Sequence, residues 1–289
     1  YLNLDLPVER WGYMAVDAHN IHEQVSGPAA AVVQQFDRIL AYGRYGAKIL
    51  GKTRGTSVGS LPHGLMLSVF QAPATDTEQE EVRSILGRFY RGQPLIGSVM
   101  SNQPRKDFGI FFQTLAELRR RGRKVYGWLH TDVAVKAGAV AQRVEDFQLQ
   151  KAVSITTGTL SDRQLACLYQ ACSLTLACGS GEGFGYPICE SLAAGTPVVH
   201  GDYAGGAELV PRTEWRVPVK ATRLESCYAL TRPVFDPVDW ANAAERVFRW
   251  QQQHGLAARL YCQGSVAHLD WATLGVRWRS WIRKGLRGD

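Results

Sequence analysis

Short apolar runs alternate with amphipathic stretches along most of the chain. Pro94–Met100 and Leu174–Cys178 have the length and composition of buried strands, and residues 108–121 repeat apolar side chains at the spacing of one helix face. This alternation predicts an α/β fold built on parallel sheet. The predicted strands cover residues 11–16, 36–42, 94–100, 124–130, 152–157, 174–178 and 196–199, and the predicted helices cover residues 43–50, 108–121, 162–171, 187–194, 238–248, 251–263 and 269–282.

Local signals mark the ends of two of these helices. Ser161 and Gln164 have the spacing of a capping box, which predicts that a helix begins at residue 162. Pro187 suits the first turn of the next helix, where its missing N–H costs no hydrogen bond. Gly195 is a natural stop for that helix.

The C-terminal segment combines tryptophan with arginine. Its large apolar side chains are predicted to share one stripe of a helix: Leu274, Trp278, Trp281 and Ile282. The stripe predicts a helix that packs back across the rest of the protein. Alternatively, the interleaved tryptophan and arginine side chains stack on the bases of a nucleic acid.

The composition is that of a soluble globular protein, with 45% hydrophobic and 20% charged residues among 289. No apolar run approaches the roughly 20 residues that span a bilayer, and the first residues do not resemble a signal peptide. The cysteines lack paired CxxC spacing, which predicts buried free thiols in a reducing compartment, cytoplasmic location and no zinc site. They are Cys167, Cys172, Cys178, Cys189, Cys227 and Cys262.

The net charge of +7 is concentrated in two places. One is Arg119–Lys124, and the other is the C-terminal segment, with Arg277, Arg279, Arg283, Lys284 and Arg287. These are either solvated helix ends and a basic tail, or surfaces that attract nucleic acid or an anionic membrane. Peripheral membrane contact is therefore one of the interactions that the sequence leaves open.

The segment Gly179–Glu190 carries the most distinctive chemistry of the chain. It follows a predicted strand, repeats glycine at every second position from 179 to 185, and runs into a helix whose free N–H groups attract phosphate. Glu182 and Glu190 lie among these amides, and carboxylates accept hydrogen bonds from sugar hydroxyls. The segment therefore indicates either a sugar-nucleotide site or a Rossmann-like turn whose glutamates cap the helix and face solvent.

The spacing of these residues resembles a known family. Glu182 and Glu190, separated by seven residues and accompanied by Gly183–Gly185, Pro187 and Gly195–Val198, resemble the E-x7-E signature of family 4 of the retaining GT-B glycosyltransferases. The resemblance implies a GT-B fold with two Rossmann-like domains, and a donor nucleotide-diphosphate sugar linked to UDP or GDP. In that family the first glutamate contacts the donor sugar and the second the ribose. The implied donor-binding residues are Gly183, Phe184, Gly185, Glu190 and Ser191, with Glu182 as a catalytic residue.

A cationic pair follows the strand at 94–100. Arg105 and Lys106 are predicted at the C-terminal edge of a parallel sheet, where cations can hold a diphosphate. The alternative is that both are solvent-exposed residues of a surface turn. The family carries an arginine and a lysine for this purpose. Lys106 matches that lysine, whereas Ser101 and Asn102 stand near the place of the arginine, so the resemblance assigns its role to Arg105.

Polar residues also follow the first predicted strand. Asp17, His19 and His22 lie at a strand end, the place where open α/β sheets bind ligands. By resemblance, Asp17 and His19 are candidate acceptor-side contacts; the alternative is a loop histidine with no role. No spacing of further ligands predicts a metal site here.

The resemblance divides the chain into three parts. Residues 1–62 form part of an N-terminal acceptor-side domain, residues 63–268 the donor domain, and residues 269–289 a helix that returns across both. The segment Ser60–Gly64 resembles the family's Pro-His-Gly linker, although Met66 replaces the usual acidic residue. The earlier β-α units of the acceptor domain are not in this sequence, so that domain is either abbreviated or incomplete.

The implied function is retaining transfer of a hexose to a hydroxyl of a glycan, lipid or small molecule. No D-x-D triplet is present, so we expect metal-independent transfer and no cofactor. One alternative is transfer to hydroxymethylated bases of DNA, as some bacteriophage glycosyltransferases do, which the basic charge favours. Another is a sugar-nucleotide-binding module without turnover.

Overall fold

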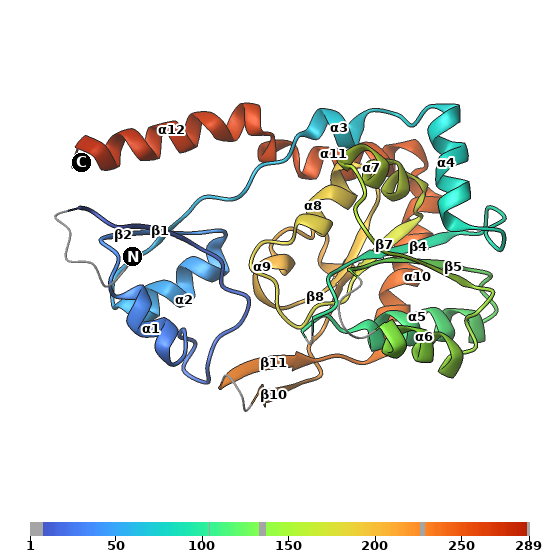
Figure 1. Ribbon diagram of the computed structural model, residues 1–289, viewed down its shortest axis with the longest axis horizontal. Coiled ribbons are helices and arrows are strands. Elements are labelled where there is room, and N and C mark those ends of the chain that lie inside the picture. Colours follow the sequence, from blue (N-terminus) through green and yellow to red (C-terminus); the bar gives the residue numbers. More distant parts are fainter. Residues whose placement is uncertain (1–7, 104, 133–136, 226–228, 288–289) are drawn as a thin grey trace.

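Two parallel sheets, one small and one large, organise the protein (Figure 1). The structure is a computed structural model that describes residues 8–103, 105–132, 137–225 and 229–287. Among these, five cysteines are buried free thiols, as predicted, while Cys227 lies outside the described residues. Cytoplasmic location stays a prediction. No helix within the described ranges has the length and apolar character needed to cross a membrane.

The small sheet is formed by the first sixty residues. Its strands β1 (Trp11–Met14), β2 (Arg38–Ala41) and β3 (Gly59–Ser60) are parallel and lie in that order. Helices α1 (Pro28–Val33) and α2 (Arg44–Arg54) accompany it, and Ile39, Ile49 and Leu50 are buried in its core. The predicted boundary at residue 62 falls in the connection after β3, and the three-part division remains a proposal.

The large sheet has the strand order β6-β5-β4-β7-β8-β9, all parallel. Its strands are β4 (Leu95–Val99), β5 (Tyr126–His130), β6 (Val153–Thr156), β7 (Leu174–Ala177), β8 (Val198–Gly201) and β9 (Arg216–Val217). The chain moves outward from β4 to β6 and then returns to β7 on the other side of β4. Ligands of open α/β sheets bind at the carboxyl ends of strands at such a switch point. The antiparallel hairpin β10 (Ala221–Glu225) and β11 (Leu230–Val234) follows.

Helices cover both faces of the large sheet (Figure 1). They are α3 (Leu67–Gln71), α4 (Asp76–Leu86), α5 (Phe108–Arg120), α6 (Ala137–Asp146), α7 (Asp162–Ala171), α8 (Tyr186–Ala193), α9 (Ala204–Ala207), α10 (Pro237–His254) and α11 (Leu256–Ser265). On one face α5 packs against α6 and α10, and on the other α7 packs against α3, α4 and α8. The predicted capping box is confirmed at the start of α7, where the Ser161 hydroxyl accepts from Gln164 N at 3.2 Å.

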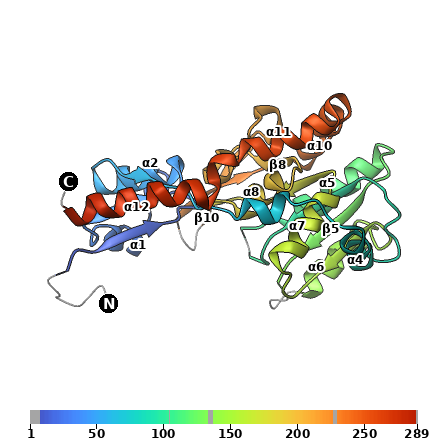
Figure 2. The same ribbon diagram turned by 90° about the horizontal axis from the view of Figure 1, so that it is seen from above.

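The last helix, α12 (Trp271–Arg287), crosses from the large sheet to the small one (Figures 1 and 2). Trp278 meets the ring of Tyr13 edge to face at 4.7 Å between centroids, and Trp281 meets Trp11 at 5.0 Å. These packed rings are not free to stack on nucleic-acid bases. Ile282 lies one turn beyond Trp278, but it is 40% exposed and does not join the packed part of the stripe.

Candidate active site

A cavity of about 650 Å³ opens between the two sheets. On the large-sheet side its wall contains residues that follow β4 and β5, together with the glycine-rich loop before α8. On the small-sheet side it contains residues that follow β1 and β2, and the linker after β3. These are the carboxyl ends of parallel strands, so the cavity occupies the place that the topology favours for a ligand. We call it the donor cavity, after the donor site that the sequence resemblance predicts.

The glycine loop is shaped by close backbone approach. A Cβ atom on Gly181 would lie 2.4 Å from the carbonyl oxygen of Asp17, so the loop touches the small sheet only because this residue is glycine. Gly185 has φ of 103° and precedes α8 as its N-cap, with no side chain capping the helix. Gly185, Tyr186 and Pro187 line the donor cavity, so the positive end of the α8 dipole lies at its wall, where it favours an anion.

Lys106 and Glu182 form an ion pair inside the donor cavity. The Lys106 ammonium donates to Oε2 of Glu182, and their side chains are only 10% and 18% exposed. Main-chain contacts position both residues, because the Lys106 backbone bridges to Gly179 and Gly205 N donates to Glu182 O at 2.9 Å. The sequence thus placed these two residues at one edge of the sheet, and the structure brings their charges into direct contact.

Arg105 joins the glycine loop to the small sheet. Its Nη1 donates to Gly181 O at 2.9 Å, and its Nε lies 3.1 Å from Oδ2 of Asp17. Both Arg105 and Asp17 line the donor cavity, together with Gly183, Phe184 and Gly185. A guanidinium has five N–H donors, so these two contacts leave donors for an anion.

Glu190 and Ser191, both in α8, differ from the residues above because they lie outside the donor cavity. Burial raises the pKa of Glu190 to about 7, although the hydroxyl of Tyr169 donates to its carboxylate at 3.0 Å. Ser191 is fully buried, and its hydroxyl contacts Thr175 Oγ1 at 2.7 Å and Thr196 O at 3.0 Å. Neither side chain is among those that line the donor cavity. We therefore assign Ser191 to the packing of α8 rather than to donor contacts.

His19 lies beside the hairpin rather than in the donor cavity. Its Nδ1 is 2.7 Å from the hydroxyl of Tyr45, and its carbonyl accepts from N and Oγ1 of Thr231, both at 2.7 Å. Burial lowers the pKa of His19. These contacts give His19 a role in holding β11 against the small sheet.

Comparisons with known proteins agree with this geometry. The family model of the glycosyl transferases group 1 matches residues 93–248, more than half of the chain. The chain belongs to the glycosyl transferase group 1 family. A comparison with curated protein sequences gave no match.

Solved structures show the fold of this group 1 chain to be GT-B. It is similar to Anabaena HepE in complex with UDP and glucose, at 15% identity and a TM-score of 0.70 over 89% of this chain and 66% of that one. A glycosyltransferase from Rickettsia africae is similar at 15% identity and a TM-score of 0.72, covering 95% and 70%. A sucrose-phosphate synthase from Thermosynechococcus elongatus matches at 17% identity and a TM-score of 0.65, covering 90% and 61%. The chain thus spans between 61% and 70% of these proteins' lengths.

The donor cavity also contains residues that the sequence analysis did not identify as site residues. His63, from the linker, lies 4.2 Å from Tyr42 and 5.2 Å from Phe184 between ring centroids, and burial lowers its pKa. His130 is the last residue of β5 and Asp132 lies two residues beyond it; burial lowers the pKa of His130. Their position at the end of a predicted strand was the feature of the sequence that could have identified them. Within the described ranges, no three His, Cys, Asp or Glu side chains are grouped so as to hold a metal ion.

Proposed function

We propose that the protein is a retaining glycosyltransferase that moves a hexose from a nucleotide-diphosphate sugar, with UDP the first nucleotide to test. The observation that carries the proposal is the Lys106–Glu182 ion pair, which lies in the donor cavity next to the start of α8. A cation and the N-terminal end of a helix suit a diphosphate, and a carboxylate suits the hydroxyls of a sugar. The choice of UDP is supported by the UDP and glucose bound to Anabaena HepE.

The donor is assigned along the line from Lys106 to α8. Its diphosphate would lie between Lys106, Arg105 and the amides around Gly183 and Gly185, and its hexose hydroxyls would face Glu182. The family resemblance assigns the ribose to Glu190, one turn further into α8, although its side chain is not part of the cavity lining and accepts a hydrogen bond from Tyr169. These contacts would hold the anomeric carbon in place for transfer.

Catalysis would then consist mainly of stabilising the leaving group. The bond between the anomeric carbon and the phosphate oxygen breaks, and negative charge grows on the diphosphate beside Lys106 and Arg105. The acceptor oxygen forms its bond on the same face of the sugar, and its proton passes to the departing phosphate. No side chain is needed as a dedicated base in this scheme, and the two cations take the place that a metal ion has in other transferases.

The acceptor would enter from the small-sheet side, past Asp17, Tyr42 and His63. The donor cavity is lined by the carboxylates of Asp17, Asp132 and Glu182 and by the cations of Arg105 and Lys106. This balance favours a neutral hydroxyl acceptor, from a glycan, lipid or small molecule, over the polyanionic backbone of DNA.

The basic cluster at the end of α5 gives little support to a DNA acceptor. Arg120 and Arg121 pair with Glu117, and Arg123 pairs with Glu245. Two carboxylates therefore already compensate two of its charges. The test described below includes hydroxymethylated DNA as an alternative acceptor.

The test is release of nucleotide from a panel of UDP- and GDP-sugars, with the anomeric configuration of the first product read by NMR. Release from one donor, insensitive to EDTA and lost in Glu182→Ala, is the expected result. An inverted product or restoration by Mn²⁺ after EDTA would refute the retaining, metal-independent mechanism. If DNA that carries hydroxymethylated bases stimulates nucleotide release, and if this stimulation weakens steeply with salt, the acceptor is DNA rather than a glycan, lipid or small molecule. Nucleotide binding without release from any donor would indicate a binding module.

A further inference from the structure

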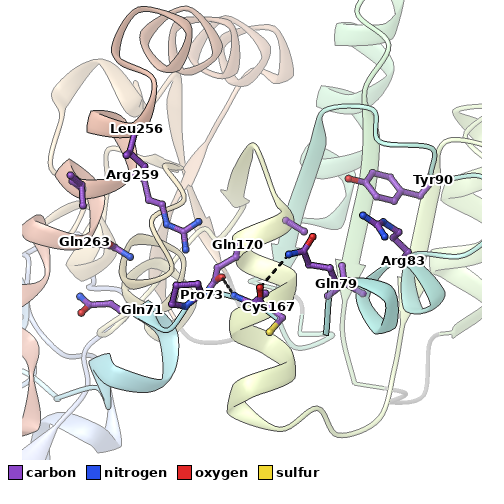
Figure 3. A pocket seen from close by; sticks show the side chains of 14 residues that line it. Gln71, Pro73, Gln79, Arg83, Tyr90, Cys167, Gln170, Leu256, Arg259 and Gln263 are labelled. Atoms are coloured by element: carbon purple, nitrogen blue, oxygen red, sulfur yellow. Dashed lines mark hydrogen bonds between the residues drawn. The ribbon is translucent and has the colours of Figure 1, made fainter. Parts of the chain in front are cut away.

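A second cavity, of about 520 Å³, lies between α4, α7 and α11 (Figure 3). It shares no lining residue with the donor cavity. Its volume lies within the range of small-molecule sites, roughly 300–1,000 Å³. Its polar walls come from glutamine, arginine and tyrosine side chains: Gln71, Gln79, Arg83, Tyr90, Gln170, Arg259 and Gln263. We call it the α11 cavity.

The α11 cavity carries cations without counter-ions. Arg83 and Arg259 line it, and none of its lining residues is Asp or Glu. Within the part of the chain that the structure describes, neither guanidinium makes a hydrogen bond or ion pair. Two of the four acidic side chains of α4 have partners elsewhere, since Glu78 pairs with Arg163 and Glu81 accepts from Gln164 at 2.6 Å. The other two, Asp76 and Glu80, are exposed and do not line the cavity. The lining of the cavity therefore contains two cations, Arg83 exposed and Arg259 half-buried, and no carboxylate.

The two cations lie at opposite ends of the α11 cavity, with Gln79 and Gln170 between them (Figure 3). Arg83 is at the end where Tyr90 lies, and Arg259 projects from the other end (Figure 3). A single compact anion would reach only one end. A ligand that uses both arginines must be elongated and must carry an acidic group at each end.

Packing holds Arg259 in place, and hydrogen bonds hold Gln170. The stem of Arg259 lies against Gly195, where a Cβ atom would come 2.3 Å from its Cγ. Gln170 donates to Phe70 O and Ala72 O, both at 2.8 Å, and accepts from Ala74 N at 3.1 Å. A cavity whose walls are fixed before binding loses less side-chain freedom when a ligand enters.

We propose that the α11 cavity binds a small organic molecule that has a polyol body and an acidic group at each end, such as a sugar bisphosphate. One phosphate pairs with Arg259 and the other with Arg83 beside the ring of Tyr90. Amides of Gln79 and Gln263 can donate to, and accept from, the hydroxyls between them. The site is separate from the donor cavity, so its ligand binds whether or not a nucleotide sugar is present.

Isothermal titration with fructose 1,6-bisphosphate tests the proposal, with fructose 6-phosphate and fructose as matched ligands. Saturable binding of the bisphosphate, weaker binding of the monophosphate and none of fructose is expected. Arg259→Gln and Arg83→Gln should each weaken bisphosphate binding roughly ten- to a hundredfold, as expected for loss of a charged hydrogen-bond donor. Arg277→Gln, at an exposed position of α12, is the charge-matched control and should bind as the wild type does.

Lys106→Ala separates this site from the donor cavity. Unchanged bisphosphate binding in Lys106→Ala, with loss in the two α11-cavity variants, would support the proposal. Loss in Lys106→Ala with normal binding in Arg259→Gln and Arg83→Gln would place the bisphosphate in the donor cavity and overturn it. Absence of saturable binding to the wild type at millimolar concentration would overturn it as well. Circular dichroism of each variant checks that the fold is retained.

Discussion

Lys106 donates a hydrogen bond to Glu182 across 76 positions of sequence, and the two side chains are largely shielded from solvent. Each is therefore the other's partner while the donor cavity holds no ligand. A nucleotide sugar would offer phosphate oxygens to the ammonium and hydroxyl groups to the carboxylate. Donor binding in our proposal thus exchanges an internal ion pair for two ligand contacts.

The variant Glu182→Gln should separate transfer from nucleotide binding. We expect turnover to fall roughly a hundredfold or more, because the group that orients the donor sugar loses its charge. Affinity for free UDP should stay the same or rise, since Lys106 no longer has a competing carboxylate. Turnover and calorimetric affinity measure the two effects. Glu80→Gln, an exposed position on α4, is the control, and normal turnover in Glu182→Gln would contradict the assigned role.

The variant Lys106→Ala should weaken binding of the diphosphate without changing binding of the nucleoside. We expect UDP affinity to fall roughly tenfold or more, because a charged donor to the phosphates is lost. Uridine affinity should not change, since the nucleoside has no phosphate to meet Lys106. Calorimetry with the two ligands gives the comparison. An equal loss for both would show that the substitution disturbs the whole cavity.

Local signals explain what the sequence predicted well. The capping box at Ser161 and Gln164 determines where α7 begins, and both of its hydrogen bonds are local. The strand-loop-helix pattern placed Lys106 and Glu182 at one sheet edge, because the carboxyl ends of parallel strands share an edge. Such features depend on short stretches of chain or on a general rule of topology.

The remaining features depend on tertiary contacts that no local pattern encodes. Ser191 follows Glu190 directly, yet its hydroxyl is buried against Thr175 from a neighbouring strand. His63 reaches the donor cavity only because the linker passes between the two sheets. The pairing of Lys106 with Glu182 likewise follows from the distance between two loops rather than from either sequence motif.

Glu190 should make stability depend on pH. Its pKa in the folded protein is about 7, above the ordinary value of 4.5, because burial disfavours the charged form. Between these pH values the folded protein binds the extra proton, so the contribution of Glu190 to stability falls as pH rises from about 4.5 to 7. Glu190→Gln removes this titration. Its free energy of unfolding should exceed that of the wild type by about 1–3 kcal/mol at alkaline pH and differ little at acidic pH.

Urea unfolding at pH values on either side of this window measures the difference. Glu80→Gln serves as the control, because its exposed carboxylate has no comparable burial. A stability difference between Glu190→Gln and the wild type that is constant with pH would show that Glu190 does not titrate in this range.

Glu208 should stabilise the contact between the two sheets. Its carboxylate accepts from the backbone N–H of Arg44 at 2.9 Å and of Tyr45 at 2.6 Å, so the residue after α9 caps the start of α2. Glu208→Ala should lower the free energy of unfolding by about 1–2 kcal/mol, the usual effect of losing an N-cap. Glu80→Ala removes a carboxylate from a site without such contacts and should have little effect. Equal unfolding curves for the two variants would argue against the cap.

Two glycines of α12 provide a matched test of how this helix packs. A Cβ atom on Gly285 would lie 2.3 Å from the ring of Trp11, whereas a Cβ atom on Gly275 would have its nearest neighbour, Arg279 Nη1, at 3.7 Å. Gly285→Ala should therefore destabilise the protein by about 1–3 kcal/mol, because the helix must move away from Trp11. Gly275→Ala should stabilise it by up to about 1 kcal/mol, because alanine is the better helix former. Thermal unfolding of both variants decides the point, and shifts of the same sign and size would mean that α12 does not pack on the small sheet through Gly285.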